Sequence, residues 1–423
     1  MSVPSQPVQG DTARDVSGWI TDFRPTKDEL DACVHCGLCL PHCPTFRLTG
    51  NEAASPRGRI TAMRAVNEGV LTVDEDFEEM LGFCLGCRAC EAVCPGLVPY
   101  GRLFEGARAE IAAQRPTLVG SARRRALGRL LPLRRLVGSA TTMAGLLQKV
   151  DGLLPNPLRK RLGGLRTLSA NPQSSLGRIV EPEGTPVGTV GLLSGCVMDP
   201  WFGGVHEASI ALLSRAGYRV VVPRSQTCCG ALAAHDGAAE EARRLAAVNQ
   251  RAFAGVDVVV ADAAGCSAHL ADYDHFVDGG FDAPTRDITV VIAEAIADGR
   301  LPRMEGNESV AYQDPCHLRH AQRITEEPRS IVRAAGYEAV EIDPDGICCG
   351  AAGLYTLLRP VAADELGKRK ADQVRATGMT TVVSANPGCE MQLRSHLGDS
   401  YRIVHPVELY HDRLVSHANA GTR

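Results

Sequence analysis

The strongest constraint in the sequence is a cysteine motif that occurs twice near the N-terminus. The pattern Cys-x2-Cys-x2-Cys-x3-Cys-Pro spans residues 33–44 and recurs at residues 84–95. Three thiolates spaced in this way wrap one cubane cluster, and the fourth, beside a proline, ligates the other cluster. The spacing therefore predicts two 4Fe-4S clusters with crossed ligands, one held by Cys33, Cys36, Cys39 and Cys94 and the other by Cys84, Cys87, Cys90 and Cys43.

Structural zinc is the alternative for these quartets, because Cys-x2-Cys is also a zinc spacing. Zinc ligands usually come as pairs separated by a longer loop, whereas each quartet here has an extra cysteine and a terminal proline. These features favour iron and sulfide. A zinc-stabilised binding scaffold would be excluded by finding iron and acid-labile sulfide in the purified protein.

The segment between the quartets is predicted to be helical. Ser55 can cap a helix that has Pro56 in its first turn and ends near Gly69, and a second short helix is expected over residues 74–81. Residues 1–115 are thus expected to form a helical two-cluster ferredoxin-type domain. Three arginines either offset the negative charge of the clusters or are solvated surface residues: Arg57, Arg59 and Arg88.

The other eight cysteines form two matching groups. Cys316 follows Cys196 by 120 positions, and each group contains one Cys-Cys-Gly. Such an offset indicates an internal duplication. It predicts two tandem α/β cysteine-rich repeats over residues 184–300 and 301–423, with the cysteines Cys196, Cys228, Cys229 and Cys266 in the first and Cys316, Cys348, Cys349 and Cys389 in the second.

Both repeats show the same predicted order of strands and helices. Strands are expected at residues 187–193, 218–222 and 256–261, then at 309–312, 337–342 and 380–384, with helices at 238–255 and 362–376. Loops at the carboxyl ends of parallel strands converge, so each repeat would gather its four cysteines. Either they form a further metal or redox centre, or they are small buried side chains in a scaffold. His269 and His317 are either ligands of such a centre or hydrogen-bonded bystanders.

A basic, leucine-rich linker is expected at residues 116–183. Three roles are open for its basic side chains. They bind anionic lipid and so place the protein near a membrane quinone, or they bind a flavoprotein, or they are solvated on the surface of a helical linker. Between residues 120 and 168 only Asp151 opposes the basic residues Arg123, Arg124, Arg125, Arg129, Arg134, Arg135, Lys149, Arg159, Lys160, Arg161 and Arg166.

Composition narrows the class of protein. The 423 residues are 44% hydrophobic and 22% charged, as in globular proteins, and a net charge of −4 argues against a nucleic-acid partner. The sequence has no secretory signal peptide and no long apolar run, so we expect a cytoplasmic protein, either free or attached peripherally to the inner face of the membrane. In that reducing compartment, 16 cysteines favour metal binding or redox chemistry over disulfides. Neither Gly-x-Gly-x-x-Gly nor a phosphate-binding Gly-x4-Gly-Lys motif occurs, so no nucleotide cradle is expected on this chain.

Motifs over nearly the whole chain resemble the iron-sulfur subunit of glycolate oxidase, a glycolate dehydrogenase. The matching stretches are residues 33–47, 55–60, 84–91, 227–232, 314–318, 348–355 and 385–389. The wider group also includes iron-sulfur subunits of lactate utilisation, of anaerobic glycerol-3-phosphate dehydrogenase and of heterodisulfide reductase.

This resemblance implies an α+β multidomain oxidoreductase subunit that transfers electrons and has no catalytic substrate residue of its own. A separate FAD-containing subunit would oxidise glycolate, and the electrons would pass through the clusters to a quinone or another acceptor. The alternatives are a lactate or glycerol-3-phosphate dehydrogenase subunit, or a thiol redox protein like heterodisulfide reductase. In those last relatives a fifth cysteine completes a non-cubane cluster site, and His269 and Gln392 take its place here.

Overall fold

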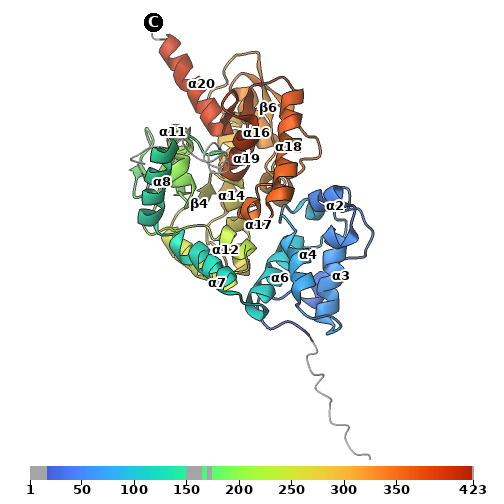
Figure 1. The fold of residues 1–423 in the computed structure, drawn as a ribbon. Helices are drawn as coiled ribbons and strands as arrows, with labels where there is room; N and C mark the ends of the chain where they lie inside the picture. The colour runs from blue at the N-terminus through green and yellow to red at the C-terminus, as the bar shows by residue number, and fades with distance from the viewer. Residues whose placement is uncertain (1–16, 149–163, 169–173, 422–423) are drawn as a thin grey trace, which may run out of the picture.

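The computed structural model describes residues 17–148, 164–168 and 174–421 (Figure 1). A helical N-terminal part is followed by connecting helices and then by two α/β parts, each built on its own sheet. This arrangement confirms the predicted α+β multidomain fold. None of the described helices is long and apolar enough to cross a lipid bilayer.

The N-terminal part contains the two helices expected between the cysteine quartets. Ser55 Oγ accepts a hydrogen bond from Gly58 N at 2.9 Å, and Asp74 caps the next helix through Phe77 N at 2.9 Å. Buried apolar side chains such as Met63 and Leu103 form its core. Its elements are α1 (Lys27–Asp31), α2 (Pro44–Thr49), η1 (Glu52–Ala54), α3 (Pro56–Asn67), α4 (Glu75–Gly82), α5 (Ala89–Ala92) and α6 (Tyr100–Gln114).

The connecting segment packs against the first repeat through ion pairs. It contains α7 (Leu118–Arg125), η2 (Ala126–Leu130) and α8 (Arg134–Gln148). Arg123 Nε donates to Asp236 at 2.8 Å, and Arg129 Nε donates to Glu241 at 2.7 Å. Arg166 pairs instead with Glu390 and Glu408 of the second repeat.

Three of the basic linker residues are therefore bound within the chain, which neither solvation nor docking anticipated. Several other charged positions of the linker are not described by the structure. Lys149, Asp151, Arg159, Lys160 and Arg161 lie outside the described residues, as do the side chains of Arg134 and Arg135.

The first repeat is a five-stranded sheet of order β1-β3-β2-β4-β5, parallel except for the edge strand β1. Its strands are β1 (Ile179–Val180), β2 (Gly188–Leu193), β3 (Tyr218–Val221), β4 (Val258–Ala261) and β5 (Thr285–Asp287). Its helices are α10 (Met198–Trp201), α11 (Gly203–Arg215), α12 (Ala231–His235), α13 (Ala239–Ala252), α14 (Ala264–Ala271), η4 (Tyr273–His275) and α15 (Ile288–Ala297).

The second repeat has a four-stranded parallel sheet of order β7-β6-β8-β9, which matches the order β3-β2-β4-β5 of the first. Its strands are β6 (Glu308–Tyr312), β7 (Tyr337–Glu341), β8 (Thr381–Val383) and β9 (Arg402–Val404). Its helices are η5 (His317–Ala321), α16 (Glu326–Ala334), α17 (Tyr355–Leu358), α18 (Pro360–Ala376), α19 (Pro387–Leu397) and α20 (Pro406–Gly421).

The six predicted strands and the two predicted helices of the repeats are all present within a few residues of their expected bounds. The short strands β1, β5 and β9 were not predicted, because two or three residues carry too little periodicity. One apolar core spans both repeats and joins Val190 and Leu212 of the first to Ile331 and Tyr410 of the second. The repeats therefore pack as one body.

Candidate metal centres

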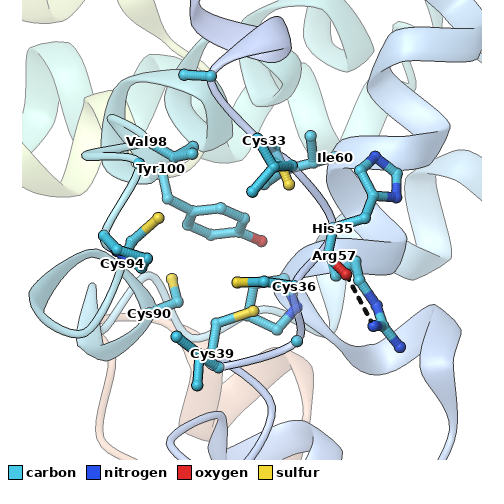
Figure 2. Close-up of a pocket in the computed structure, with 17 residues that line it drawn as sticks. Cys33, His35, Cys36, Cys39, Arg57, Ile60, Cys90, Cys94, Val98 and Tyr100 are labelled. Carbon is cyan, nitrogen blue, oxygen red and sulfur yellow. Dashed lines mark hydrogen bonds between the residues drawn. The ribbon is translucent and has the colours of Figure 1, made fainter.

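The first candidate centre lies between α1 and α5. Cys33, Cys36 and Cys39 line a pocket together with Cys94, and Figure 2 shows the side chain of Tyr100 directed into the same space. Cys36 is exposed, whereas Cys33, Cys39 and Cys94 are half-buried. This pocket therefore opens at the surface on the side of Cys36.

The loop that carries these cysteines turns through left-handed residues. His35 has φ of 59° and Gly37 has φ of 84°. The positive φ of Gly37 disfavours any larger residue there, and a Cβ would also lie 3.0 Å from Arg57 Nη1 and displace that side chain. Arg57 braces the loop, because its Nη1 donates to His35 O at 3.2 Å while its Nε pairs with Glu52 at 2.7 Å.

The second candidate centre is more deeply placed. Cys84, Cys87 and Cys90 line a pocket with Cys43, and all but Cys84 are buried. Two donors reach Cys84 Sγ, namely Gly86 N at 3.4 Å and Tyr100 OH at 3.6 Å. The second pocket thus takes three cysteines from the second quartet and Cys43 from the first, while the first pocket takes three from the first quartet and is also lined by Cys90 and Cys94 of the second. This lining is compatible with the crossed arrangement that the spacing predicts. The ligand assignment itself stays a prediction.

The environment of Arg59 indicates whether the second pocket can hold a cluster with negative charge. Its side chain is fully buried and lines this pocket; Nε donates to Met80 O at 2.9 Å and Nη2 to Thr45 Oγ1 at 3.2 Å, but the buried Nη1 has no partner. A buried cation without an anion is costly. Burial opposes the charged form, yet nearby Cys84 raises the pKa of Arg59 overall. The donor set and this cation fit a cluster with negative charge, and Arg59 is not a solvated surface residue.

Burial disfavours the free thiolates at both centres. Burial raises the pKa of the Cys39 thiol to about 11, and burial raises the pKa values of Cys87 and Cys90 well above the usual range. Because only a thiolate ligates iron, cluster binding must displace these protons.

The repeat cysteines also come together, two by two. In the first repeat Cys196 Sγ lies 3.1 Å from Cys228 Sγ, and Cys229 Sγ lies 3.2 Å from Cys266 Sγ. In the second, Cys349 Sγ lies 3.3 Å from Cys389 Sγ, and Cys316 hydrogen-bonds to Cys348. All are free thiols. Among the described residues, no group of three or more His, Cys, Asp or Glu has the spacing for a single metal ion.

The histidines beside these cysteines occupy different settings. His269 is only 4% exposed and its Nε2 has no hydrogen-bond partner. His317 Nδ1 lies 3.6 Å from Cys316 Sγ, and its Nε2 is unpartnered as well. A third histidine, His235, lies beside them: its Nδ1 is 2.8 Å from Glu105, and its ring stacks on that of His317 at 5.8 Å. No motif marks His235, since its position depends on packing between domains.

The second centre lies directly against the second repeat. Leu85 and Cys87 pack with Cys348 and Tyr355, and Tyr355 OH donates to Phe83 O at 3.1 Å. Nearby, Arg359 Nη1 donates to Glu79 at 2.6 Å. The buried cluster pocket and the cysteines of the second repeat are therefore neighbours.

Fold and sites together define a class of protein: an iron-sulfur protein with a two-cluster domain followed by two cysteine-rich domains. Residues 29–98 match the family model of the 4Fe-4S dicluster domain, and residues 190–271 and 310–394 match that of the cysteine-rich domain. The match of the first model confirms the predicted pair of 4Fe-4S clusters as cofactors.

Similar proteins identify the family within this class. A probable glycolate oxidase iron-sulfur subunit of Bacillus subtilis is 36% identical over 91% of this chain and 94% of its own length, and the Escherichia coli glycolate oxidase iron-sulfur subunit is 31% identical over the same shares. A fumarate reductase (CoM/CoB) subunit of Methanothermobacter marburgensis is 27% identical over 89% of this chain and 70% of its own length. The chain belongs to the family of glycolate oxidase iron-sulfur subunits, as the motifs predicted, and is an electron-transferring oxidoreductase subunit.

Proposed function

We propose that this chain carries electrons from an FAD-containing, glycolate-oxidising subunit, through its two clusters, to a quinone or another acceptor. The observation that carries the proposal is the placement of the two cysteine pockets side by side. Cys90 and Tyr100 line both pockets, so the two centres share a wall. A cubane takes one electron at a time, so two adjacent clusters drain a two-electron donor in single steps.

The two centres differ in their exposure to solvent, and this difference suggests the direction in which electrons move between them. The first centre reaches the surface at Cys36, and exposed apolar side chains flank it at Val34, Leu38 and Leu97. The second is buried against the second repeat. We place the flavoprotein at the exposed first centre, and the exit toward the acceptor at the second.

The test is to co-purify the chain with its flavoprotein and assay dye reduction by glycolate, lactate and glycerol-3-phosphate. Wild-type complex should turn over glycolate, and Cys36→Ala and Cys87→Ala should each abolish turnover, while Thr61→Ala, an exposed change on α3, should not. Full turnover by Cys87→Ala would refute the relay. Turnover with only lactate or glycerol-3-phosphate would overturn the glycolate assignment.

The close sulfur pairs favour a further redox or metal centre in the repeats. Iron analysis of Cys228→Ala and Cys348→Ala tests this. A loss of iron beyond normal preparation scatter would indicate metal there, while unchanged iron together with altered thiol oxidation would indicate dithiol chemistry like that of heterodisulfide reductase. Unchanged iron and unchanged oxidation would leave these cysteines as buried scaffold residues. The domain bounds 1–115, 116–183, 184–300 and 301–423 also remain our proposal.

The connecting segment is proposed to hold the protein peripherally on the inner face of the membrane. Its apolar side chains lie exposed beside basic residues, and Leu118 is 93% exposed. Leu133→Glu combined with Met143→Glu should weaken sedimentation with anionic vesicles, and Val361→Glu, an exposed apolar position on α18, is the matched control. Equal sedimentation of all three proteins would refute attachment here. Arg123 is unsuited to this test, because it pairs with Asp236.

A further inference from the structure

A second kind of pocket lies where the cluster domain meets both repeats. Its walls include Arg88 and Glu105 of the N-terminal part, His235 and His269 of the first repeat and His317 of the second. We call this the histidine pocket. One wall is the chain from Gly86 to Glu91, which also carries Cys87 and Cys90 of the second cluster site.

The histidine pocket leaves buried hydrogen-bonding capacity unused. His269 Nε2 and His317 Nε2 are buried and have no partner. The ring of His235 lies 5.8 Å from that of His317 and 6.3 Å from that of His269, so the three imidazoles form one group. A buried polar atom without a partner is destabilising, and such atoms commonly mark a ligand or water.

The charged groups around the pocket are already paired. Arg88 is bonded to Glu91 and, at 2.6 Å, to Asp272, while Arg102 pairs with Glu29 at 2.8 Å. Glu105 lies 2.8 Å from His235 Nδ1. Burial lowers the pKa of His269 to about 4, so this imidazole is neutral at neutral pH. The pocket is therefore suited to a neutral ligand rather than to an anion.

The wall chemistry restricts that ligand further. Phe104 supplies an aromatic surface to the pocket, and the backbone of Gly86 approaches this ring so closely that a Cβ there would lie 3.3 Å from it. Flat rings pack well on such a surface. Imidazole nitrogens suit carbonyl or hydroxyl oxygens at the edge of the ring. A planar, neutral compound with such oxygens, next to a one-electron centre, has the chemistry of a quinone.

We propose that the histidine pocket binds a quinone, with its oxygens hydrogen-bonded to His269 and His317. The inference rests on the proposed function, because it assigns a site to the acceptor. Reduction adds two electrons and two protons to the quinone and yields the hydroquinone. The electrons come singly from the reduced iron-sulfur centres, which are oxidised in turn. The protons come from solvent by way of His235, whose side chain is one-third exposed.

The experiment measures binding, so it needs no electron donor. The oxidised, cluster-loaded full chain is titrated anaerobically with the soluble quinone 2,3-dimethoxy-5-methyl-1,4-benzoquinone in a calorimeter. His269→Leu and His317→Leu should each weaken binding about tenfold, the effect of losing one hydrogen bond. His405→Leu is the matched control, since His405 is another buried histidine with an unpartnered Nε2 but lies outside the pocket. Its affinity should equal that of the wild type.

A second variant guards against misfolding of the histidine variants. Gly265 of α14 lines the pocket, and a Cβ there would make only an ordinary contact, with Asn386 Oδ1 at 3.7 Å, so Gly265→Leu adds a bulky side chain at the pocket wall. It should abolish quinone binding with iron content unchanged. Absence of binding by the wild type, or equal affinity in the pocket variants, would overturn the proposal. Binding is read without turnover, so this result is separate from the dye assay of the relay.

Discussion

Individual side chains set the electrostatic surroundings of the second centre. Tyr100 OH donates to Cys84 Sγ at 3.6 Å, and the fully buried Arg59 lines the same pocket with one nitrogen unpartnered. Donors and positive charge near cluster sulfurs stabilise the reduced, more negative state. Both residues should therefore raise the reduction potential of the second cluster.

Tyr100→Phe removes the hydroxyl and keeps the ring. Since a hydrogen bond contributes about 1 kcal/mol, and 1.4 kcal/mol corresponds to 59 mV for one electron, the second cluster should become harder to reduce by about 40 mV. A potentiometric titration followed by electron paramagnetic resonance measures this shift. An unchanged or higher potential would contradict the role of the hydroxyl.

Arg59→Met removes a buried charge and should lower the potential of the second cluster by more than Tyr100→Phe does. Arg57→Met is the control, because Arg57 braces the loop of the first centre and does not line the second pocket. It should affect the first cluster only. Equal shifts of both clusters in the Arg59 variant would indicate a general loss of structure instead.

At the scale of elements, α3 connects the two cluster loops. Its N-cap Ser55 is buried, accepts from Gly58 N and donates to Glu52 at 3.0 Å, while Glu52 holds Arg57 against the first loop. The Ser55 cap therefore connects the stability of α3 to the position of the loop that carries the cysteines of the first centre.

Ser55→Ala should lower the free energy of unfolding by about 1 kcal/mol, the usual cost of a lost N-cap. Thr61→Ala on the same helix is exposed and bonds only Arg57 O, so it should change stability by less. Chemical denaturation of cluster-loaded protein compares the two. Equal effects would show that capping is not the cause.

For the whole molecule, Asp236 is the junction that holds the cluster domain on the first repeat. It is 6% exposed in its side chain and accepts from Arg108 of α6 at 3.2 Å and from Arg123 of α7 at 2.8 Å. Two consecutive helices, α6 and α7, thus meet the distant first repeat at one carboxylate, which keeps the second centre against the repeats.

Asp236→Asn leaves two arginines around a neutral amide, and breaking a buried pair costs about 3 kcal/mol or more. The variant should unfold at lower denaturant, and protease should cut it sooner between the cluster domain and the first repeat. Asp298→Asn breaks an exposed pair with Arg300 and is the control, with an expected loss below about 1 kcal/mol. Similar losses in both variants would remove Asp236 from this role.

The order of residues alone predicts the two-cluster domain, the duplication and most strands of the repeats. These features depend on spacing along the chain: a cluster loop is defined by neighbouring cysteines, the cap of α3 by Ser55 and Pro56, and the strands by local apolar runs.

The three-dimensional structure was needed to establish which distant side chains meet. It placed Arg59 in the buried pocket, bound Arg123 to Asp236 and brought His235 and His269 of the first repeat together with His317 of the second. No local pattern encodes such contacts, because they arise when separate elements bury their apolar faces and carry unrelated polar groups into one interface.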